Sequence, residues 1–223
     1  PLVVPEVNSE DIYLNNGIIS NPNCSTIQAV IPLKVLSDNY GIKRIIYSTY
    51  QAVSGAGIKG IEDLQNTSKG KKAQKFPYPI YNNCIPHIDI FLENGYTKEE
   101  MKMIEETKKI LHLPNLNITA TCVRVPVLNC HCESINIELE SEFDILEVKQ
   151  LLNKKSGIVV HDDTDKNIYP LPTFVDGKNE VFVGRIRRDY SLANGINLWC
   201  VADNIRKGAA TNAVQILEYL INK

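Results

Sequence analysis

NITATCVRVPV at residues 117–127 and CESINIELE at residues 132–140 are the two stretches that most clearly alternate apolar with polar side chains. Such alternation places every second side chain on one face of an extended chain, which predicts two long β-strands. Residues 43–50 alternate in a similar way. Shorter strands are predicted at 156–160, 181–187 and 197–202, and residues 2–4 are predicted to be the end of a buried strand that begins earlier.

Helical patterns separate these strands. From Cys24 onward apolar residues recur near a period of 3.6, and Pro32 within the run predicts either a kink or a helix that packing enforces. The stretch 98–111 is the clearest helix, because Thr97 and Glu100 can form a capping box at its start. Further helices are predicted at 59–65, 143–153 and 204–221. Strands and helices are mixed without regular alternation, so the sequence predicts an α+β fold with a mixed sheet.

Residues 66–86 are predicted to form a long loop. Loops of this length inside a compact domain are usually functional or cover another part of the molecule. The loop contains the one basic cluster of the sequence, from Lys69 to Lys75. We interpret this cluster as a solvated loop rather than as a phosphate-binding patch.

Composition and charge exclude several classes of function. Hydrophobic residues make up 43% of the chain and charged residues 22%, as in ordinary globular proteins. The net charge of -2 and the lack of a basic stripe argue against nucleic-acid binding. No stretch approaches the ~20 apolar residues of a membrane span. The six cysteines lack the spacing of a disulfide scaffold, which predicts a reduced, cytoplasmic setting.

Cys24 is the first candidate for chemistry. It follows the turn-forming residues Asn21, Pro22 and Asn23 and stands at the first turn of a predicted helix. Unpaired N–H groups and the helix dipole at that position favour a thiolate, which is a good nucleophile toward a carbonyl carbon. The same N–H groups suit an oxyanion. The competing interpretation of Cys24 is a buried, inert cysteine.

His131 lies between the two long predicted strands, where it could take a proton from Cys24 or from a thiohemiacetal. A structural histidine at a strand end is the alternative. The triplet Cys130-His131-Cys132 also suggests a metal site. Neighbouring residues of a strand point to opposite faces, so three consecutive ligands fit badly and no metal is predicted.

Weaker signals come from charged and small residues. The guanidinium of Arg124 can grip a carboxylate in a fork, or it can form a surface ion pair. Glu99 and Lys102 lie three apart on one helix face, where they can hold the charged groups of a ligand or simply pair with each other. The turn Ser54-Gly55-Ala56-Gly57 would let a flat ligand approach the backbone. It is not a dinucleotide fingerprint, because no G-x-G-x-x-G segment follows a strand.

The order of these motifs resembles the aspartate-semialdehyde dehydrogenase family. The resemblance rests on five ordered segments that together span essentially the whole chain, namely 20–26 with 48–57, 97–102, 124–133, 181–187 and 202–210. It implies a mixed sheet with helices on one face, similar to the C-terminal domain of enzymes like glyceraldehyde-3-phosphate dehydrogenase. It also implies reduction of L-aspartyl 4-phosphate to aspartate 4-semialdehyde with NADPH, in the pathway to lysine, threonine and methionine.

The resemblance further implies a role for each matching residue. Cys24 would be the nucleophile, Gln51 would position the acyl intermediate and His131 would be the acid/base. Substrate and cofactor contacts are implied for Arg124 (α-carboxylate), Glu99 (amino group), Lys102 (phosphate), and for Ser54, Gly55, Ala56, Gly57 and Asn204 (NADP). The family usually has Gly-His-Ser where this chain has Cys130-His131-Cys132. This difference affects the fine positioning of His131 and the sensitivity of the site to oxidants.

The domain expectations follow from the same resemblance. Residues 1–22 are expected to be the last strand and connector of a dinucleotide-binding domain that is mostly missing. Residues 23–203 are expected to form the catalytic domain, which the family pairs into a homodimer. Residues 204–223 are expected to form a helix that packs on the missing domain. These residues alone would therefore be inactive and bind NADP poorly.

Two other functions stay open from the sequence. A related reductase of acyl phosphates or acyl-CoA thioesters would use the same cysteine and histidine, but would leave Glu99 unpaired in the site. A non-catalytic oligomerisation module is the third possibility.

Overall fold

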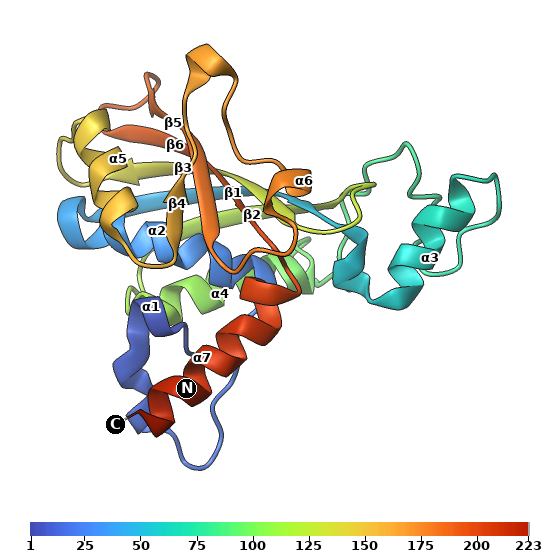
Figure 1. Cartoon of the computed structure of the whole chain (residues 1–223), viewed down its shortest axis with the longest axis horizontal. Coiled ribbons are helices and arrows are strands. Elements are labelled where there is room, and N and C mark those ends of the chain that lie inside the picture. The colour runs from blue at the N-terminus through green and yellow to red at the C-terminus, as the bar shows by residue number, and fades with distance from the viewer. Residues whose placement is uncertain (223) are drawn as a thin grey trace.

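The computed structural model describes residues 1–222 and contains a six-stranded mixed sheet (Figure 1). Its strands lie in the order β2-β1-β3-β6-β5-β4. The pairs β1/β2 and β4/β5 are parallel, and the pairs β1/β3, β3/β6 and β5/β6 are antiparallel. The strand bounds are β1 Ile42–Gln51, β2 Asn117–Arg124, β3 His131–Leu139, β4 Ile158–Val160, β5 Val181–Asp189 and β6 Gly195–Ala202. All six predicted internal strands are present, and the α+β prediction is confirmed.

Three helices cover one face of the sheet, namely α2 (Cys24–Tyr40), α4 (Lys98–Ile110) and α5 (Ile145–Lys154). The main core lies between this face and the helices, and includes Tyr47, Ile135 and Leu198 in register across β1, β3 and β6. The opposite face carries Tyr50 and Trp199, whose rings lie 5.6 Å apart. The short α6 (Pro172–Val175) packs on that face.

Helix α2 is buried on almost every side, from Ser25 to Leu36. Asn23 begins it, because its side-chain oxygen accepts hydrogen bonds from the N–H groups of Ser25 and Thr26. The helix continues through Pro32 without ending. The helix packs against the sheet, α4 and α5, and this packing offsets the hydrogen bond lost at Pro32. A helix enforced by packing was one of the two predictions for this segment.

The first residues differ from the prediction of a strand followed by loop. Leu2 forms a single bridge with Ser20, and the chain then turns into α1 (Pro5–Asn8) and a 3-10 helix (Ser9–Leu14). Pro5 suits the first turn of a helix, and Asn8 accepts a hydrogen bond from the N–H of Val4. These short-range capping interactions outweigh the extended tendency of the valines, so the strand prediction for residues 2–4 was wrong.

The end of the chain crosses back over its beginning. A π-helical turn (Arg206–Ala210) leads into α7 (Thr211–Ile221), which lies near both ends of the chain in Figure 1. Lys207 is 1% exposed, and its ammonium lies 2.8 Å from each carboxylate oxygen of Glu6. Burial lowers the pKa of Lys207 below its ordinary value, and the Glu6 carboxylate opposes that shift. This buried ion pair joins the first and last helical segments.

Replacing Glu6 with glutamine should destabilise the fold by about 3 kcal/mol, because the Lys207 ammonium would remain buried without its counter-charge. Urea unfolding followed by circular dichroism measures this loss. The matched control is Asp38→Asn, which removes an exposed ion pair with Lys34 and should cost at most about 0.5 kcal/mol. Equal unfolding midpoints for the two variants would contradict the structural importance of the Glu6–Lys207 pair.

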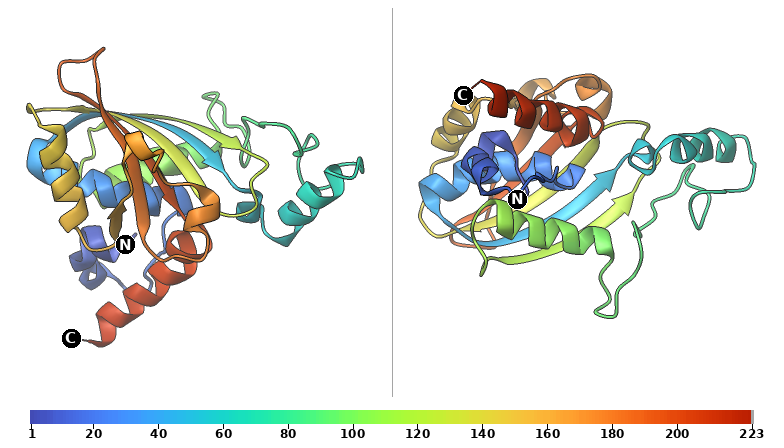
Figure 2. Two further views of the ribbon diagram at one scale, coloured as in Figure 1. Left: turned by 45° about the horizontal axis from the view of Figure 1, so that its top comes forward. Right: turned by 90° about the horizontal axis from the view of Figure 1, so that it is seen from below.

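A lobe projects from one end of the sheet (Figure 2). It contains a 3-10 turn (Val53–Ala56), helix α3 (Ile58–Thr67) and the extended chain up to Pro86. A small apolar cluster of its own holds the lobe together, with Phe76, Ile80 and Ile85 facing Ile61 and Leu64. No helix within residues 1–222 is long and apolar enough to cross a membrane.

Candidate active site

A cavity of about 510 Å³ opens where α2, α4, β1 and β2 meet the projecting lobe. It brings together residues of the predicted segments 20–26, 48–57, 97–102 and 124–133. Its walls consist of Asn23, Cys24, Gln51, Gly55, Ala56, Lys75, Phe76, Pro77, His87, Ile88, Asp89, Glu99, Lys102, Arg124 and His131.

Cys24 is the first residue of α2 and is partly buried at the base of the cavity. Burial and the nearby Glu99 carboxylate raise the pKa of its thiol to about 12, although the N–H of Ser25 and the Arg124 guanidinium act in the opposite direction. The Ser25 N–H thus acts in the direction predicted for the helix start, but burial and Glu99 outweigh it. The sequence does not show that Glu99 lies near Cys24.

His131 begins β3 and is 1% exposed. Its Nδ1 accepts a hydrogen bond of 3.0 Å from the backbone N–H of Ala52. This bond implies a neutral ring with its proton on Nε2, and burial together with Arg124 lowers the pKa of His131 to about 3. The ring therefore presents a hydrogen-bond donor to the cavity. A role as base requires the other tautomer, which would break the bond to Ala52.

Arg124 ends β2, and its guanidinium is 6% exposed. Nη1 donates a 2.6 Å hydrogen bond to the backbone oxygen of Ala52, and the ring of Phe76 lies 5.8 Å from the guanidinium carbon. No carboxylate within residues 1–222 forms an ion pair with Arg124. A buried cation without a counter-charge is costly, so this site favours an anionic ligand.

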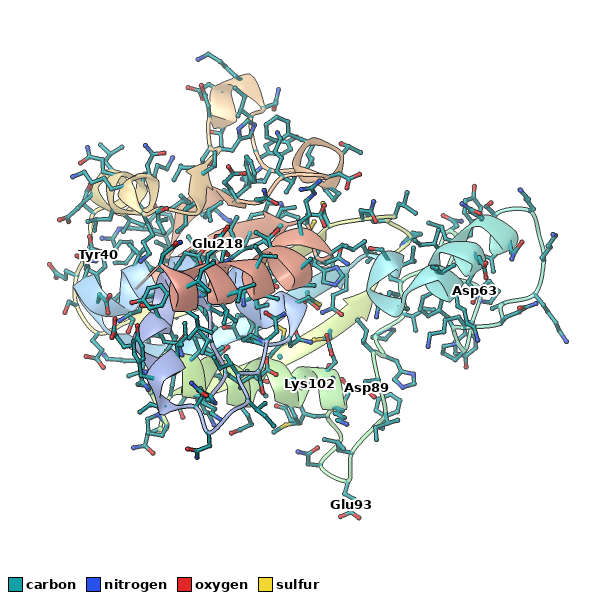
Figure 3. The ribbon with its side chains drawn as sticks, turned by 60° about the horizontal axis from the view of Figure 1, so that its bottom comes forward. Tyr40, Asp63, Asp89, Glu93, Lys102 and Glu218 are labelled. Atoms are coloured by element: carbon teal, nitrogen blue, oxygen red, sulfur yellow. The ribbon has the colours of Figure 1, made fainter. Side chains whose placement is uncertain are left out.

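Glu99 and Lys102 lie in the first turns of α4, whose predicted capping box is present. Glu99 accepts hydrogen bonds from Asn23 (2.9 Å) and from Gln51 (3.1 Å). The Lys102 ammonium lies 3.7 Å from Glu99 and 3.2 Å from Asp89. Lys102 and Asp89 lie next to each other at the start of α4 in Figure 3. Glu99 and Lys102, which were predicted to hold a ligand or to pair, therefore form an ion pair with each other.

Gly55 leaves space for the two most important side chains of the cavity. A Cβ at this position would lie 2.9 Å from Arg124 Nη1 and 3.0 Å from His131 Nε2. We expect Gly55→Ala to lower kcat/KM about 100-fold, because displacing catalytic groups by roughly 1 Å has effects of this size. Steady-state kinetics measure the effect, and thermal unfolding is the control for damage to the fold. Unchanged kinetics in a folded variant would contradict the tight packing of these groups.

The remaining predicted cofactor residues, Ser54, Gly57 and Asn204, do not line the cavity. The hydroxyl of Ser54 and the side-chain amide of Asn204 are hydrogen-bonded at 3.1 Å, and Asn204 also accepts a bond from the N–H of Cys130. Gly57 has a positive φ of 74° and precedes α3. In this structure Ser54 and Asn204 join the projecting lobe to the end of β6.

A buried carboxyl lies behind His131. Glu133 is 0% exposed, and burial raises its pKa well above the ordinary value. Gln28 of α2 donates a hydrogen bond to the backbone oxygen of His131. The histidine is therefore held by polar contacts from β1 and α2.

Several residues of the cavity were not singled out from the sequence. Asn23 stands directly before Cys24, within the quoted motif. Lys75, Phe76 and Pro77 belong to the long loop that was expected to be functional or to cover something, and that length was the available signal. Nothing local pointed to His87, Ile88 or Asp89, which reach the site only through the path of the chain.

Comparison with known proteins defines the class of this fold and site. The family described as "Semialdehyde dehydrogenase, dimerisation domain" matches residues 33–207. The chain is 56% identical over 232 residues to the aspartate-semialdehyde dehydrogenase of Aquifex aeolicus, covering 100% of this chain and 68% of that protein. The enzyme of Bacillus subtilis is 49% identical over 234 residues, with coverage of 99% and 68%.

A solved structure gives the same result. The crystal structure of aspartate semialdehyde dehydrogenase II of Vibrio cholerae, complexed with ASA, superposes with a TM-score of 0.95 at 48% identity. It is matched over 100% of this chain and 68% of that chain. The chain therefore belongs to the aspartate-semialdehyde dehydrogenase family, whose members are oxidoreductases.

Proposed function

We propose that this chain carries the catalytic residues for NADPH-dependent reduction of L-aspartyl 4-phosphate to L-aspartate 4-semialdehyde. The observation that carries the proposal is the meeting of three groups in one cavity. These are the thiol of Cys24, the Nε2–H side of His131 and the Arg124 guanidinium, which has no ion-pair partner within residues 1–222. An acyl group held at a thiol beside a hydrogen-bond donor is the arrangement that covalent aldehyde chemistry requires.

Substrate recognition follows from the charges of the wall. Arg124 can bind the α-carboxylate in a two-pronged hydrogen bond, which replaces the missing counter-charge. Glu99 faces the cavity beside Cys24 and can accept the α-ammonium. Gln51 donates to Glu99 and so fixes the carboxylate that orients the amino end. Lys102 could contact phosphate if it moved away from Asp89.

The chemistry begins at Cys24. Its sulfur attacks the acyl carbon, the C–O bond to phosphate breaks and the thiol proton passes to the departing phosphate, which gives a thioester and hydrogen phosphate. NADPH supplies a hydride to the thioester carbon when bound. The oxygen of the resulting thiohemiacetal accepts a hydrogen bond from His131 Nε2, as a neutral imidazole can stabilise developing negative charge. Breaking the C–S bond releases the aldehyde, and the sulfur recovers a proton.

The cofactor site is proposed to be shared with a second domain. Gly55 and Ala56 lie on the cavity wall, where a small-residue backbone permits close approach of a flat ring. Ser54, Gly57 and Asn204 would support that wall. The solved structure of the Candida albicans relative is described as containing NADP, with a TM-score of 0.75 at 29% identity.

An apolar surface supports this domain division. Helix α7 exposes Val214, Leu217 and Ile221, and Leu14 and Ile18 are exposed in the N-terminal segment. Such a surface is typical of a face that another domain covers. We therefore propose that residues 1–22 belong to a nucleotide-binding domain and that residues 204–223 pack on it. Residues 23–203 would form the catalytic and dimerisation domain. Residues 1–223 alone are then expected to bind NADP weakly and to be inactive.

A second surface suits a homodimer. The sheet face opposite α2 leaves Tyr50 39% exposed and Trp199 partly exposed, and the matched family is described as a dimerisation domain. We propose that two copies pair through this face.

The proposal is tested with a polypeptide that joins residues 1–223 to a nucleotide-binding domain. We expect phosphate-dependent reduction of NADP⁺ when aspartate semialdehyde is supplied. Acyl-CoA thioesters and semialdehydes without an amino group should react poorly, because neither supplies the ammonium that Glu99 is proposed to bind. Efficient turnover of such substrates would favour a related acyl reductase. A folded protein with no turnover of any of them would favour an oligomerisation module.

A further inference from the structure

Residues 74–77 of the projecting lobe are fixed by one buried carboxylate. Asp63 of α3 is 1% exposed and accepts hydrogen bonds from the backbone N–H groups of Gln74 (2.8 Å), Lys75 (2.8 Å) and Phe76 (3.0 Å). Burial alone raises the pKa of this carboxyl, but the three N–H groups outweigh that effect and lower it. Figure 3 shows Asp63 within the lobe, away from Lys102 and Asp89. Asp63 therefore acts on the cavity through the loop that it binds.

The loop forms one wall of the cavity. Lys75, Phe76 and Pro77 all line it. Phe76 covers the guanidinium of Arg124 on one side, and its ring also approaches the position that a Cβ of Gly60 would occupy, at 3.3 Å. Gly60 has no side chain to displace the Phe76 ring, and Asp63 holds the backbone of Phe76. Helix α3 thus keeps the ring beside Arg124. Lys75, the neighbour of Phe76, is an exposed residue that lines the same cavity.

The charges of the cavity leave a place for Lys75. Among the other groups of the wall, Lys102 is paired with both Glu99 and Asp89, and Arg124 is the group proposed to bind the α-carboxylate. Aspartyl phosphate carries more negative than positive charge, through its phosphate and carboxylate. Lys75 forms no ion pair within residues 1–222. With Arg124 assigned to the α-carboxylate, Lys75 is the wall cation left for the phosphate.

We infer that Lys75, held in place by Asp63, contacts the phosphate of the substrate. This assignment rests on the proposed function and adds a cation to the phosphate site that the family resemblance places at Lys102. It also revises the interpretation of the basic run from Lys69 to Lys75. Lys71, Lys72 and Lys75 are all exposed, but of these three only Lys75 lines the cavity.

The test compares Lys75→Met with Lys72→Met in the complete enzyme. Both variants remove one charge from the same loop, but only Lys75 lines the cavity. In the direction that consumes phosphate, Lys75→Met should raise the KM for inorganic phosphate about tenfold, or about 1.4 kcal/mol. The KM for aspartate semialdehyde should stay within about twofold. Lys72→Met should leave both constants unchanged.

Equal effects of the two variants, or an unchanged KM for phosphate in Lys75→Met, would overturn the assignment. Asp63→Asn should also raise the KM for phosphate, because the loop loses the carboxylate that holds it. If the enzyme shows no turnover, the proposed function fails, and titration with inorganic phosphate followed by phosphorus NMR still decides the role of Lys75. Weaker phosphate binding in Lys75→Met than in Lys72→Met supports it, and equal binding refutes it.

Discussion

Replacing Cys24 with alanine should lower kcat by about 10⁴–10⁶-fold, because removing a covalent nucleophile eliminates the reaction path that it opens. The change deletes one sulfur atom at the start of α2 and leaves the cap formed by Asn23 intact. Phosphate-dependent reduction of NADP⁺ by the complete enzyme measures the loss. Acid-quenched, unreduced substrate complexes should contain a thioester in the native enzyme and none in the variant.

The control for Cys24 is Cys84→Ala, which removes an exposed cysteine outside the cavity. We expect that variant to keep full activity and the native unfolding midpoint. Substantial turnover by a folded Cys24→Ala enzyme would show that another group attacks the substrate, and the thioester mechanism would have to be abandoned.

Replacing Arg124 with leucine should lower kcat/KM for aspartate semialdehyde by roughly 30- to 5,000-fold, because truncating one partner of a buried charge pair costs about 2–5 kcal/mol. The variant also leaves the backbone oxygen of Ala52 without the guanidinium that donates to it. Kinetics with 3-aminopropanal, which lacks the α-carboxylate, separate recognition from damage to the site. With that aldehyde the native and variant enzymes should differ by less than tenfold.

An arginine outside the cavity provides the matched control. Arg188 donates to the backbone oxygen of Phe143 and does not line the site, so Arg188→Leu should leave the preference for the carboxylate unchanged. If native enzyme used both aldehydes equally well, Arg124 would not be the carboxylate-binding residue, whatever the activity of its variant.

The sequence predicted elements well where one pattern dominates locally. The alternation in β2 and β3, the capping box of α4 and the asparagine before α2 are all encoded within a few residues, and each element appears with bounds close to those expected. The strand prediction for residues 2–4 failed, because the extended tendency of Val3 and Val4 competes with Pro5 and Asn8, and capping decides the outcome.

The site was predictable as a set of motifs but not as an electrostatic environment. Cys24, Glu99, Arg124 and His131 do meet in one cavity. The high pKa of Cys24 could not be derived, because it depends on burial and on a carboxylate from a helix 75 positions further along the chain. The donor role of His131 Nε2 depends likewise on the N–H of Ala52, which only the pairing of distant segments brings to Nδ1.

The contact between Gly208 and Cys24 has a consequence for biosynthesis. A Cβ on Gly208 would lie 2.9 Å from the Cβ of Cys24, so the π-helical turn closes directly over the reactive residue. During translation Cys24 emerges from the ribosome 184 residues before Gly208 does, so the backbone side of Cys24 gains this contact only when the chain is nearly complete. The start of helix α2 is therefore among the last parts of the domain to be fully packed.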